Sequence, residues 1–220
     1  MIIRVGGIPG VGKTTIVNEL LTITQDKGFL VKEAPVRETL RELAGVKTIE
    51  EYRALPEETR GSFYPEMEKR IYQLDRVYPN QLWIHDSHFS FFSHKTGQYN
   101  IRPIQLEDYK QLLAIVVVAA NPSVICDRRI KDFSTRSDRH LHSVKTLNER
   151  QEYEIKVAQL QAEQLKVPIK ILRNNDNDST IDASKAFLVF LISTQSKGSP
   201  PPAFLSIIRK FLSLIIFDRM

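Results

Sequence analysis

The sequence predicts an α/β fold built on a five-stranded parallel sheet with helices on both faces. Two observations predict this class. First, short segments of apolar and β-branched residues alternate with longer segments in which apolar residues recur at helical spacing. Such alternation places the strands side by side in a parallel sheet. Second, a glycine-rich segment separates the first strand-like segment from the first helix-like one.

Local patterning defines the first elements. Apolar residues predict a strand over residues 1–5. From Thr14 onward the apolar residues fall on one helical face, and Gly28 is a natural end for that helix. Residues 29–34 predict a second strand, and VRETLRELA, after Pro35, predicts a short helix.

The middle of the chain alternates between charged and apolar segments. Residues 49–78 show helical spacing, and Pro65 predicts a split into two helices. Residues 82–86 predict the third strand, and residues 87–104, which show no period, predict a long loop. Residues 112–120 form the most apolar stretch of this region, as expected of a central parallel strand covered on both faces.

A basic helix-like segment comes next, and then a long helix is predicted over residues 144–165. Residues 167–172 predict the fifth strand, and residues 179–192 predict a last helix that Ser179 or Thr180 caps. We expect these elements to form one domain over residues 1–193.

The last residues differ in composition. Residues 194–202 contain glycine, serine and consecutive prolines and predict a linker. Residues 203–220 have apolar positions at helical spacing and predict an amphipathic tail, which could pack on protein or lie on a membrane surface. Because its cationic residues are few, we favour protein packing, either on its own domain or in a homo-oligomer with the tail as the candidate contact.

Composition narrows the class of protein. Hydrophobic residues make up 42% of the 220 residues and charged residues 26%, as in globular domains. The net charge of +5 favours anionic partners, and nothing resembles a nucleic-acid-binding module, so we expect no nucleic acid. The single cysteine excludes an internal disulfide. Because no signal peptide and no apolar run long enough to span a membrane are found, we expect a soluble cytoplasmic protein.

The glycine-rich segment satisfies the pattern G-x-x-x-x-G-K-[ST] in full. Its glycines let backbone N–H groups converge on phosphate oxygens, and the following helix adds its positive end. The alternative, a turn with an accidental lysine, does not explain its place between a strand and an amphipathic helix. We predict an ATP site in which Lys13 reaches the β- and γ-phosphates and Thr14 ligates Mg²⁺. The predicted loop residues are Gly7, Pro9, Gly10, Val11, Gly12, Lys13, Thr14 and Thr15.

Other residues indicate the fate of the bound ATP. The chain lacks the Asp-x-x-Gly and Asn-Lys-x-Asp elements of switch GTPases. Asp86, which ends the third strand, can join the Mg²⁺ shell, or it can merely cap the next turn. Ser87 and His88 come directly after it, so no adjacent carboxylate is available to activate water. These features favour phosphoryl transfer over hydrolysis.

Phosphoryl transfer between two anionic molecules requires cations. Residues 127–142 come after the most apolar strand and carry several cations: Arg128, Arg129, Lys131, Arg136 and Arg139. Arginine binds phosphate oxygens bidentately, and a segment that closes over the nucleotide excludes water. The alternative is a solvated helix end neutralised by nearby aspartates. Beside a phosphate-binding loop, we interpret this segment as a lid.

Taken together, these motifs resemble the archaeal-type adenylate kinases, which are small P-loop nucleoside monophosphate kinases. The resemblance covers most of residues 1–193 and rests on the order and spacing of GIPGVGKTT, YRALPEETR, DSH, GQYNIRP, RRIKDFSTR and ILRNNDN. It implies the fold of that family and an acceptor-binding region over about residues 35–78.

The resemblance implies roles on the acceptor side. Arg53 would meet the acceptor phosphate, and Asp86 with His88 would lie between the two substrates. The family has a small Gly-Thr pair after the second strand, but this chain has Val-Arg-Glu there, which places Arg37 at the acceptor.

On the nucleotide side, the resemblance implies that Arg128, Arg136 and Arg139 clamp the transferred group. The second lid arginine is shifted by one residue relative to the family. Asn174 or Asn175 would approach the adenine of ATP.

The sequence therefore predicts a kinase that transfers the γ-phosphoryl group of MgATP to a nucleoside monophosphate, with AMP as the acceptor that the resemblance implies. The attacking phosphate oxygen is already ionised, so alignment and charge neutralisation suffice without a general base. Two alternatives stay open: a P-loop kinase of another small acceptor, and an ATP-binding regulatory or assembly protein with slow ATPase activity. ATP and Mg²⁺ are the expected cofactors.

Overall fold

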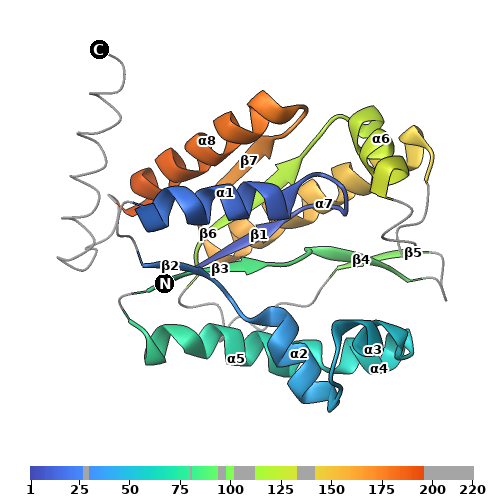
Figure 1. The fold of residues 1–220 in the computed structure, drawn as a ribbon, viewed down its shortest axis with the longest axis vertical. Coiled ribbons are helices and arrows are strands. Elements are labelled where there is room, and N and C mark those ends of the chain that lie inside the picture. The colour runs from blue at the N-terminus through green and yellow to red at the C-terminus, as the bar shows by residue number, and fades with distance from the viewer. Residues whose placement is uncertain (27–29, 80, 94–97, 102–111, 133–141, 196–220) are drawn as a thin grey trace.

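A five-stranded parallel sheet lies at the centre of the described structure (Figure 1). The computed structural model describes residues 1–26, 30–79, 81–93, 98–101, 112–132 and 142–195. The sheet order is β2-β3-β1-β6-β7, and every neighbouring pair is parallel. The central strand β1 (Ile2–Gly6) is flanked by β3 (Leu82–Asp86) and β6 (Leu112–Ala119), with β2 (Val31–Glu33) and β7 (Ile169–Arg173) at the edges. The predicted fold class is therefore confirmed.

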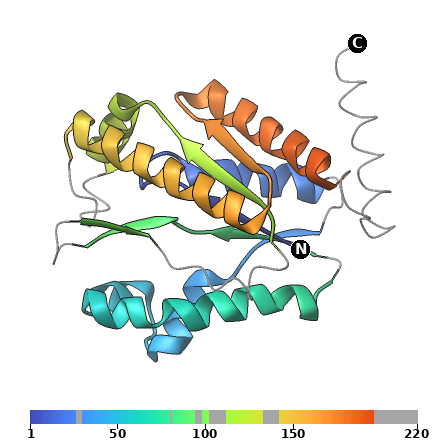
Figure 2. The same ribbon diagram turned by 180° about the vertical axis from the view of Figure 1, so that it is seen from behind.

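Helices cover both faces of the sheet. On one face α1 (Lys13–Asp26) packs beside α8 (Asn177–Gln195), and on the other lie α5 (Tyr64–Val77) and α7 (Val144–Leu165) (Figures 1 and 2). Shorter helices connect these layers: α2 (Val36–Ala44), α3 (Ile49–Ala54), α4 (Glu57–Ser62) and α6 (Pro122–Asp132). Among these described helices, none is long and apolar enough to cross a membrane.

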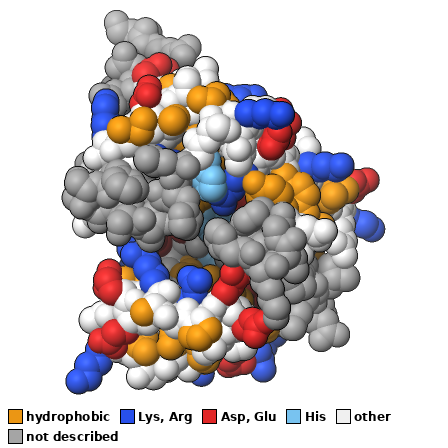
Figure 3. All heavy atoms as spheres, turned by 90° about the vertical axis from the view of Figure 1, so that its right-hand side faces the viewer, with side chains coloured by type: hydrophobic (Ala, Val, Ile, Leu, Met, Phe, Trp, Pro, Cys, Tyr) orange, Lys and Arg blue, Asp and Glu red, His pale blue; other side chains and the backbone are white. Residues whose placement is uncertain are grey.

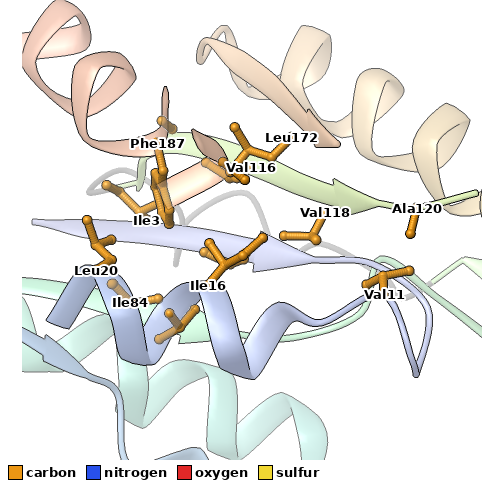
Figure 4. Close-up of a cluster of buried hydrophobic side chains, with 14 of the residues drawn as sticks. Ile3, Val11, Ile16, Leu20, Ile84, Val116, Val118, Ala120, Leu172 and Phe187 are labelled. Atoms are coloured by element: carbon orange, nitrogen blue, oxygen red, sulfur yellow. The ribbon is translucent and has the colours of Figure 1, made fainter. Parts of the chain in front are cut away.

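Alternation along β1 divides the core between the two faces. Ile3 and Val5 belong to the cluster that contains α1 and α8, whereas Ile2 belongs to the cluster that contains α5 and α7. Figure 4 shows Ile3 among side chains from α1 and α8, with Phe187 close to it. Burial of each such side chain stabilises the fold by about 1.5–3 kcal/mol. The strand that leads into the glycine-rich loop is therefore fixed from both sides.

Several predicted boundaries agree with the structure, since α2, β3 and α7 begin and end at the predicted residues. Segment 49–78 differs, because it forms three helices and not two. Pro65 lies in the first turn of α5, where a missing N–H is tolerated. The breaks fall instead around Leu55 and Phe63.

The prediction of a long loop over residues 87–104 was also wrong. It contains an antiparallel hairpin of β4 (Ser90–Ser93) and β5 (Gln98–Ile101). The backbone N–H groups of Phe89 and Ser90 bind the carboxylate of Glu154 on α7. This tertiary contact leaves no periodic signal in the sequence.

The start of α8 differs as well. The helix begins at Asn177, so neither Ser179 nor Thr180 is its cap residue. The Thr180 hydroxyl instead donates a hydrogen bond to Asn174 Oδ1 at 2.7 Å.

Some predictions lie outside the described residues. Residues 133–141 hold most of the predicted lid, including Arg136 and Arg139. Residues 196–220 hold the predicted tail and most of the predicted linker.

Candidate functional site

The segment between β1 and α1 has the geometry of an anion-binding loop. It leaves the carboxyl end of the central strand between β3 and β6. Gly7 and Gly12 have φ values of +139° and +88°, which L side chains rarely adopt. A Cβ on Gly7 would lie 2.3 Å from the Val118 carbonyl oxygen, and one on Gly12 would lie 2.2 Å from Asn174 Nδ2. Backbone packing and φ therefore require glycine at position 7, and the positive φ favours glycine at position 12.

Lys13 lies across this loop at the start of α1. Its side chain is buried, its ammonium donates a hydrogen bond to the Gly7 carbonyl at 2.7 Å, and it lies 3.9 Å from Asp86 Oδ1. Thr14 and Thr15, in the same first turn, are exposed. The loop, the ammonium and these hydroxyls thus meet at the positive end of a 14-residue helix.

Of the two predicted adenine residues, Asn174 contacts the loop. Asn174 is buried and donates from Nδ2 to the Val11 carbonyl at 2.9 Å. Asn175 is exposed and accepts a hydrogen bond from the backbone N–H of Asn121 at 2.7 Å. Arg128 donates to the carbonyl oxygens of Val11 at 3.3 Å and Asn174 at 3.0 Å. The structure therefore brings Arg128 and Asn174 together at the loop.

A cavity of about 410 Å³ opens on the other side of Asp86. It is lined by the end of β2, the start of α2 and the end of β3: Glu33, Ala34, Pro35, Val36, Arg37, Glu38 and Asp86. Figure 3 views the molecule from the side on which the loop lies, and basic, acidic and histidine side chains surround a hollow near its centre. Because Asp86 lines the cavity and also approaches Lys13, the cavity adjoins the anion-binding loop.

The cavity wall carries opposed charges. Solvent reaches the side chain of Glu33, but the surrounding protein desolvates it enough to raise its pKa. The carboxylate of Asp86 raises the pKa of Glu33 further, Arg37 lowers it, and Glu38 adds a smaller upward effect. Among the described residues, the cavity wall thus combines one guanidinium with three carboxyl groups.

His88 and Arg53 lie away from the cavity lining. His88 is half-buried and lies on the segment that follows β3. Its Nδ1 atom is 3.9 Å from Glu154 Oε1 on α7. Arg53 is half-exposed on α3 and pairs with Glu50 at 3.9 Å. Neither is among the described residues that line the cavity.

Sequence reasoning did not assign Glu33 or Glu154 to the site, and it named Arg129 only as one of the cations of the predicted lid. Glu33 had a usable signal, because it ends a strand just before the acceptor segment. Arg129 is buried against the loop, and Glu154 anchors the segment after Asp86. Both residues come from helices distant in sequence, so no local pattern indicated these contacts.

Comparison with known proteins identifies the family. Residues 6–148 match the family described as an AAA domain. The chain belongs to this AAA domain family. Three curated relatives are called adenylate kinase: those of Pyrococcus horikoshii (29% identical), Pyrococcus abyssi (28%) and Pyrococcus furiosus (27%), each match covering 83% of this chain and 90% of the relative. The predicted resemblance to archaeal adenylate kinases is confirmed, and this AAA domain protein is an adenylate kinase-like P-loop kinase.

A solved structure supports the fold of this AAA domain chain. A shikimate kinase from Acinetobacter baumannii, in complex with shikimate, superposes with a TM-score of 0.50 at 13% identity. The match covers 88% of this chain and 93% of that one. At this identity the similarity concerns the fold and does not identify the acceptor.

The described residues also bear on metal binding. Among them, no group of three or more His, Cys, Asp or Glu side chains could hold a metal ion. Mg²⁺ is bound in kinase sites by one or two protein oxygens together with phosphates and water. The exposed Thr14 hydroxyl and the half-exposed Asp86 carboxylate near Lys13 fit that mode.

Proposed function

We propose that this P-loop kinase transfers the γ-phosphoryl group of MgATP to a nucleoside monophosphate, with AMP as the preferred acceptor. One observation carries the proposal: the cavity beside Asp86 adjoins the anion-binding loop across the 3.9 Å contact between Asp86 and Lys13. Two anionic molecules can therefore approach each other at a single lysine. The Pyrococcus relatives named adenylate kinase support AMP as the acceptor.

In this proposal ATP occupies the loop. Backbone N–H groups of residues 7–14 and the ammonium of Lys13 bind its phosphates, and Lys13 exchanges the Gly7 carbonyl for phosphate oxygens. Thr14 and Asp86 would hold Mg²⁺, which would neutralise phosphate charge there. Asn174, Asn175 and Arg128 border the adenine side.

The acceptor occupies the cavity between β2 and α2. Among the described residues of the cavity wall Arg37 is the cation, and it would bind the acceptor phosphate, with Arg53 approaching from α3. A phosphate oxygen of the acceptor attacks the γ-phosphorus, and the bond from that phosphorus to the β–γ bridging oxygen breaks. No proton needs to be removed, because the attacking oxygen is ionised at neutral pH.

Acceptor turnover tests this proposal. The protein is incubated with MgATP and, separately, AMP, CMP, UMP, GMP or dTMP, and new diphosphate is measured. Rapid ADP formation with AMP, well above that with the other monophosphates, is the expected result. If another monophosphate is turned over instead, the proposed reaction class stands and that monophosphate, not AMP, is the preferred acceptor. Tight ATP binding without turnover of any monophosphate would overturn the proposal and favour a regulatory ATP-binding protein or another acceptor.

A further inference from the structure

The carbonyl groups of Pro9 and Val11, near the tip of the anion-binding loop, are held by side chains from outside the loop. Arg129 on α6 donates two hydrogen bonds to the Pro9 carbonyl oxygen, from Nε at 3.0 Å and from Nη2 at 2.7 Å. The Val11 carbonyl oxygen accepts from Arg128 and Asn174. Two segments distant in sequence therefore fix two peptide groups of the loop.

Fixing a carbonyl also fixes the N–H of the same peptide group. The described peptide bonds are trans, so the C=O of one residue and the N–H of the next point in opposite directions. When Arg129 holds the Pro9 carbonyl, the N–H of Gly10 is turned away from Arg129. The hydrogen bonds to Val11 likewise orient the N–H of Gly12. These two N–H groups belong to the set that converges on phosphate in loops of this kind.

Arg129 is built into the protein behind the loop. Its side chain is 2% exposed although it carries a full charge. A Cβ on Gly10 would lie 3.3 Å from Arg129 Cγ and Nε, so the loop rests directly on this side chain. A buried guanidinium is costly unless it is well hydrogen-bonded, and two charge-assisted hydrogen bonds to one carbonyl offset part of that cost. Two donors of the guanidinium, Nε and Nη2, thus bind the loop backbone.

We propose that Arg129 is a positioning residue for the nucleotide, and that it sets the direction of the Gly10 N–H through the Pro9 carbonyl. The inference rests on the proposed ATP site and is independent of the acceptor. The proposed role of Arg129 differs from that of Arg128. Arg128 is half-buried, and the resemblance places it at the transferred group. α6 also leads directly into residues 133–141, so the same helix carries the support of the loop and the start of the predicted lid.

Two substitutions test the proposal by direct nucleotide binding. Arg129→Met retains the apolar stem and removes both hydrogen bonds, whereas Arg129→Lys retains the charge and can donate to Pro9 from a single nitrogen. Dissociation constants for MgATP and MgADP are measured by titration calorimetry on the full chain, and steady-state KM values are measured for ATP and AMP. We expect Arg129→Met to weaken MgATP binding about tenfold or more, with the AMP KM changed less than about twofold. Arg129→Lys should fall between Arg129→Met and the unsubstituted protein.

A matched control separates positioning from general destabilisation. Val157→Ala on α7 removes buried apolar volume on the other face of the sheet and lowers the melting temperature without touching the loop. It should leave the dissociation constant for MgATP unchanged. Equal losses of ATP and AMP affinity in Arg129→Met, or unchanged ATP affinity at a lowered melting temperature, would show a structural role only. A fall in kcat with unchanged ATP affinity would make Arg129 a catalytic residue.

The two proposals fail separately. If the unsubstituted protein binds MgATP but turns over no monophosphate, the proposed function fails and the binding comparison still decides the role of Arg129. If Arg129→Met does not fold, the comparison between Arg129→Lys and the unsubstituted protein decides it. Unchanged MgATP affinity in a folded Arg129→Lys would then overturn the inference.

Discussion

The ammonium group of Lys13 binds the Gly7 carbonyl oxygen at 2.7 Å and lies 3.9 Å from the carboxylate of Asp86. Lys13 is thereby placed between the anion-binding loop and the cavity that adjoins it. The distance to Asp86 is long for an ion pair, so the contact with Asp86 is weaker than the hydrogen bond to Gly7.

Removing this ammonium should abolish turnover. Lys13→Ala removes the ammonium that neutralises charge where the two phosphates meet, and we expect kcat to fall about a hundredfold or more. Lys156→Ala, which removes an exposed lysine from α7, is the matched control and should retain full activity. Diphosphate formation at saturating MgATP and AMP measures both variants. Substantial activity in Lys13→Ala would remove the lysine from the proposed site.

Substitution of Asp86 should change the dependence on Mg²⁺. Asp86→Asn keeps the size of the side chain but removes the charge that holds the ion or its water shell. We expect a higher Mg²⁺ concentration for half-maximal rate, with a smaller change in the AMP KM. Titration of Mg²⁺ at fixed ATP measures this. An unaltered Mg²⁺ requirement would leave Asp86 as a residue that only lines the cavity.

The two arginines assigned to the acceptor can be ranked. Arg37 lines the cavity, whereas Arg53 is half-exposed and pairs with Glu50. Arg37→Ala should raise the AMP KM about tenfold, and Arg53→Ala should raise it less. The ATP KM is the internal control, because neither arginine contacts the loop in the described structure. A normal AMP KM in Arg37→Ala would place the acceptor elsewhere.

The raised pKa of Glu33 predicts a pH-dependent stability. Between the usual pKa of 4.5 and the higher value in the folded protein, the folded state binds more protons, so the free energy of unfolding falls as the pH rises. The glutamine side chain in Glu33→Gln cannot ionise, so this variant should have a higher melting temperature than the unsubstituted protein at about pH 8. The difference should shrink at about pH 4, where the Glu33 side chain is mostly protonated in both the folded and the unfolded protein.

Thermal unfolding at several pH values measures the effect of Glu33. Glu163→Gln removes an exposed carboxylate from α7 and controls for a general change in net charge. A stabilisation of Glu33→Gln that is equal at both pH values would show that ionisation is not the cause.

The fold was predictable where a local sequence pattern determines the element. The apolar run of β6 and the spacing of α7 defined their elements, and the glycine pattern placed the anion-binding loop. The predictions failed where the cause is tertiary. The hairpin of β4 and β5 is anchored by Glu154. Pro65 lies in the first turn of α5 because one helix ends and the next begins just before it, and no periodicity in the sequence indicates that boundary.

The candidate site was predictable to a similar extent. A motif assigned Lys13 and the end of the third predicted strand assigned Asp86, and the structure brings the two side chains together. The contacts of Arg129 to the loop could not be inferred, because a basic segment gives no sign of which arginine is buried. Glu33 was overlooked because its environment comes from β3 and α2 together.

A buried ion pair beneath the site gives the last prediction. Arg4 interrupts the apolar strand β1, and its side chain is 0% exposed. Its partners come from α5, α7 and the segment after β3: Glu68 Oε1 at 3.4 Å, Gln161 Oε1 at 3.3 Å, Ser87 Oγ at 3.3 Å, the His88 carbonyl at 3.1 Å and the Phe89 ring at 5.0 Å from its centroid.

Breaking this pair on one side should cost more than removing it. Arg4→Met removes the cation that pairs with the buried carboxylate of Glu68 and should lower the free energy of unfolding by about 3 kcal/mol. Arg4→Met combined with Glu68→Leu replaces both charges by apolar groups and should recover most of the loss. Urea unfolding of the two single variants and the double variant gives the coupling energy. A double variant as unstable as the sum of the singles would show that the hydrogen bonds to Ser87 and His88, and not the pairing with Glu68, fix Arg4 beneath the site.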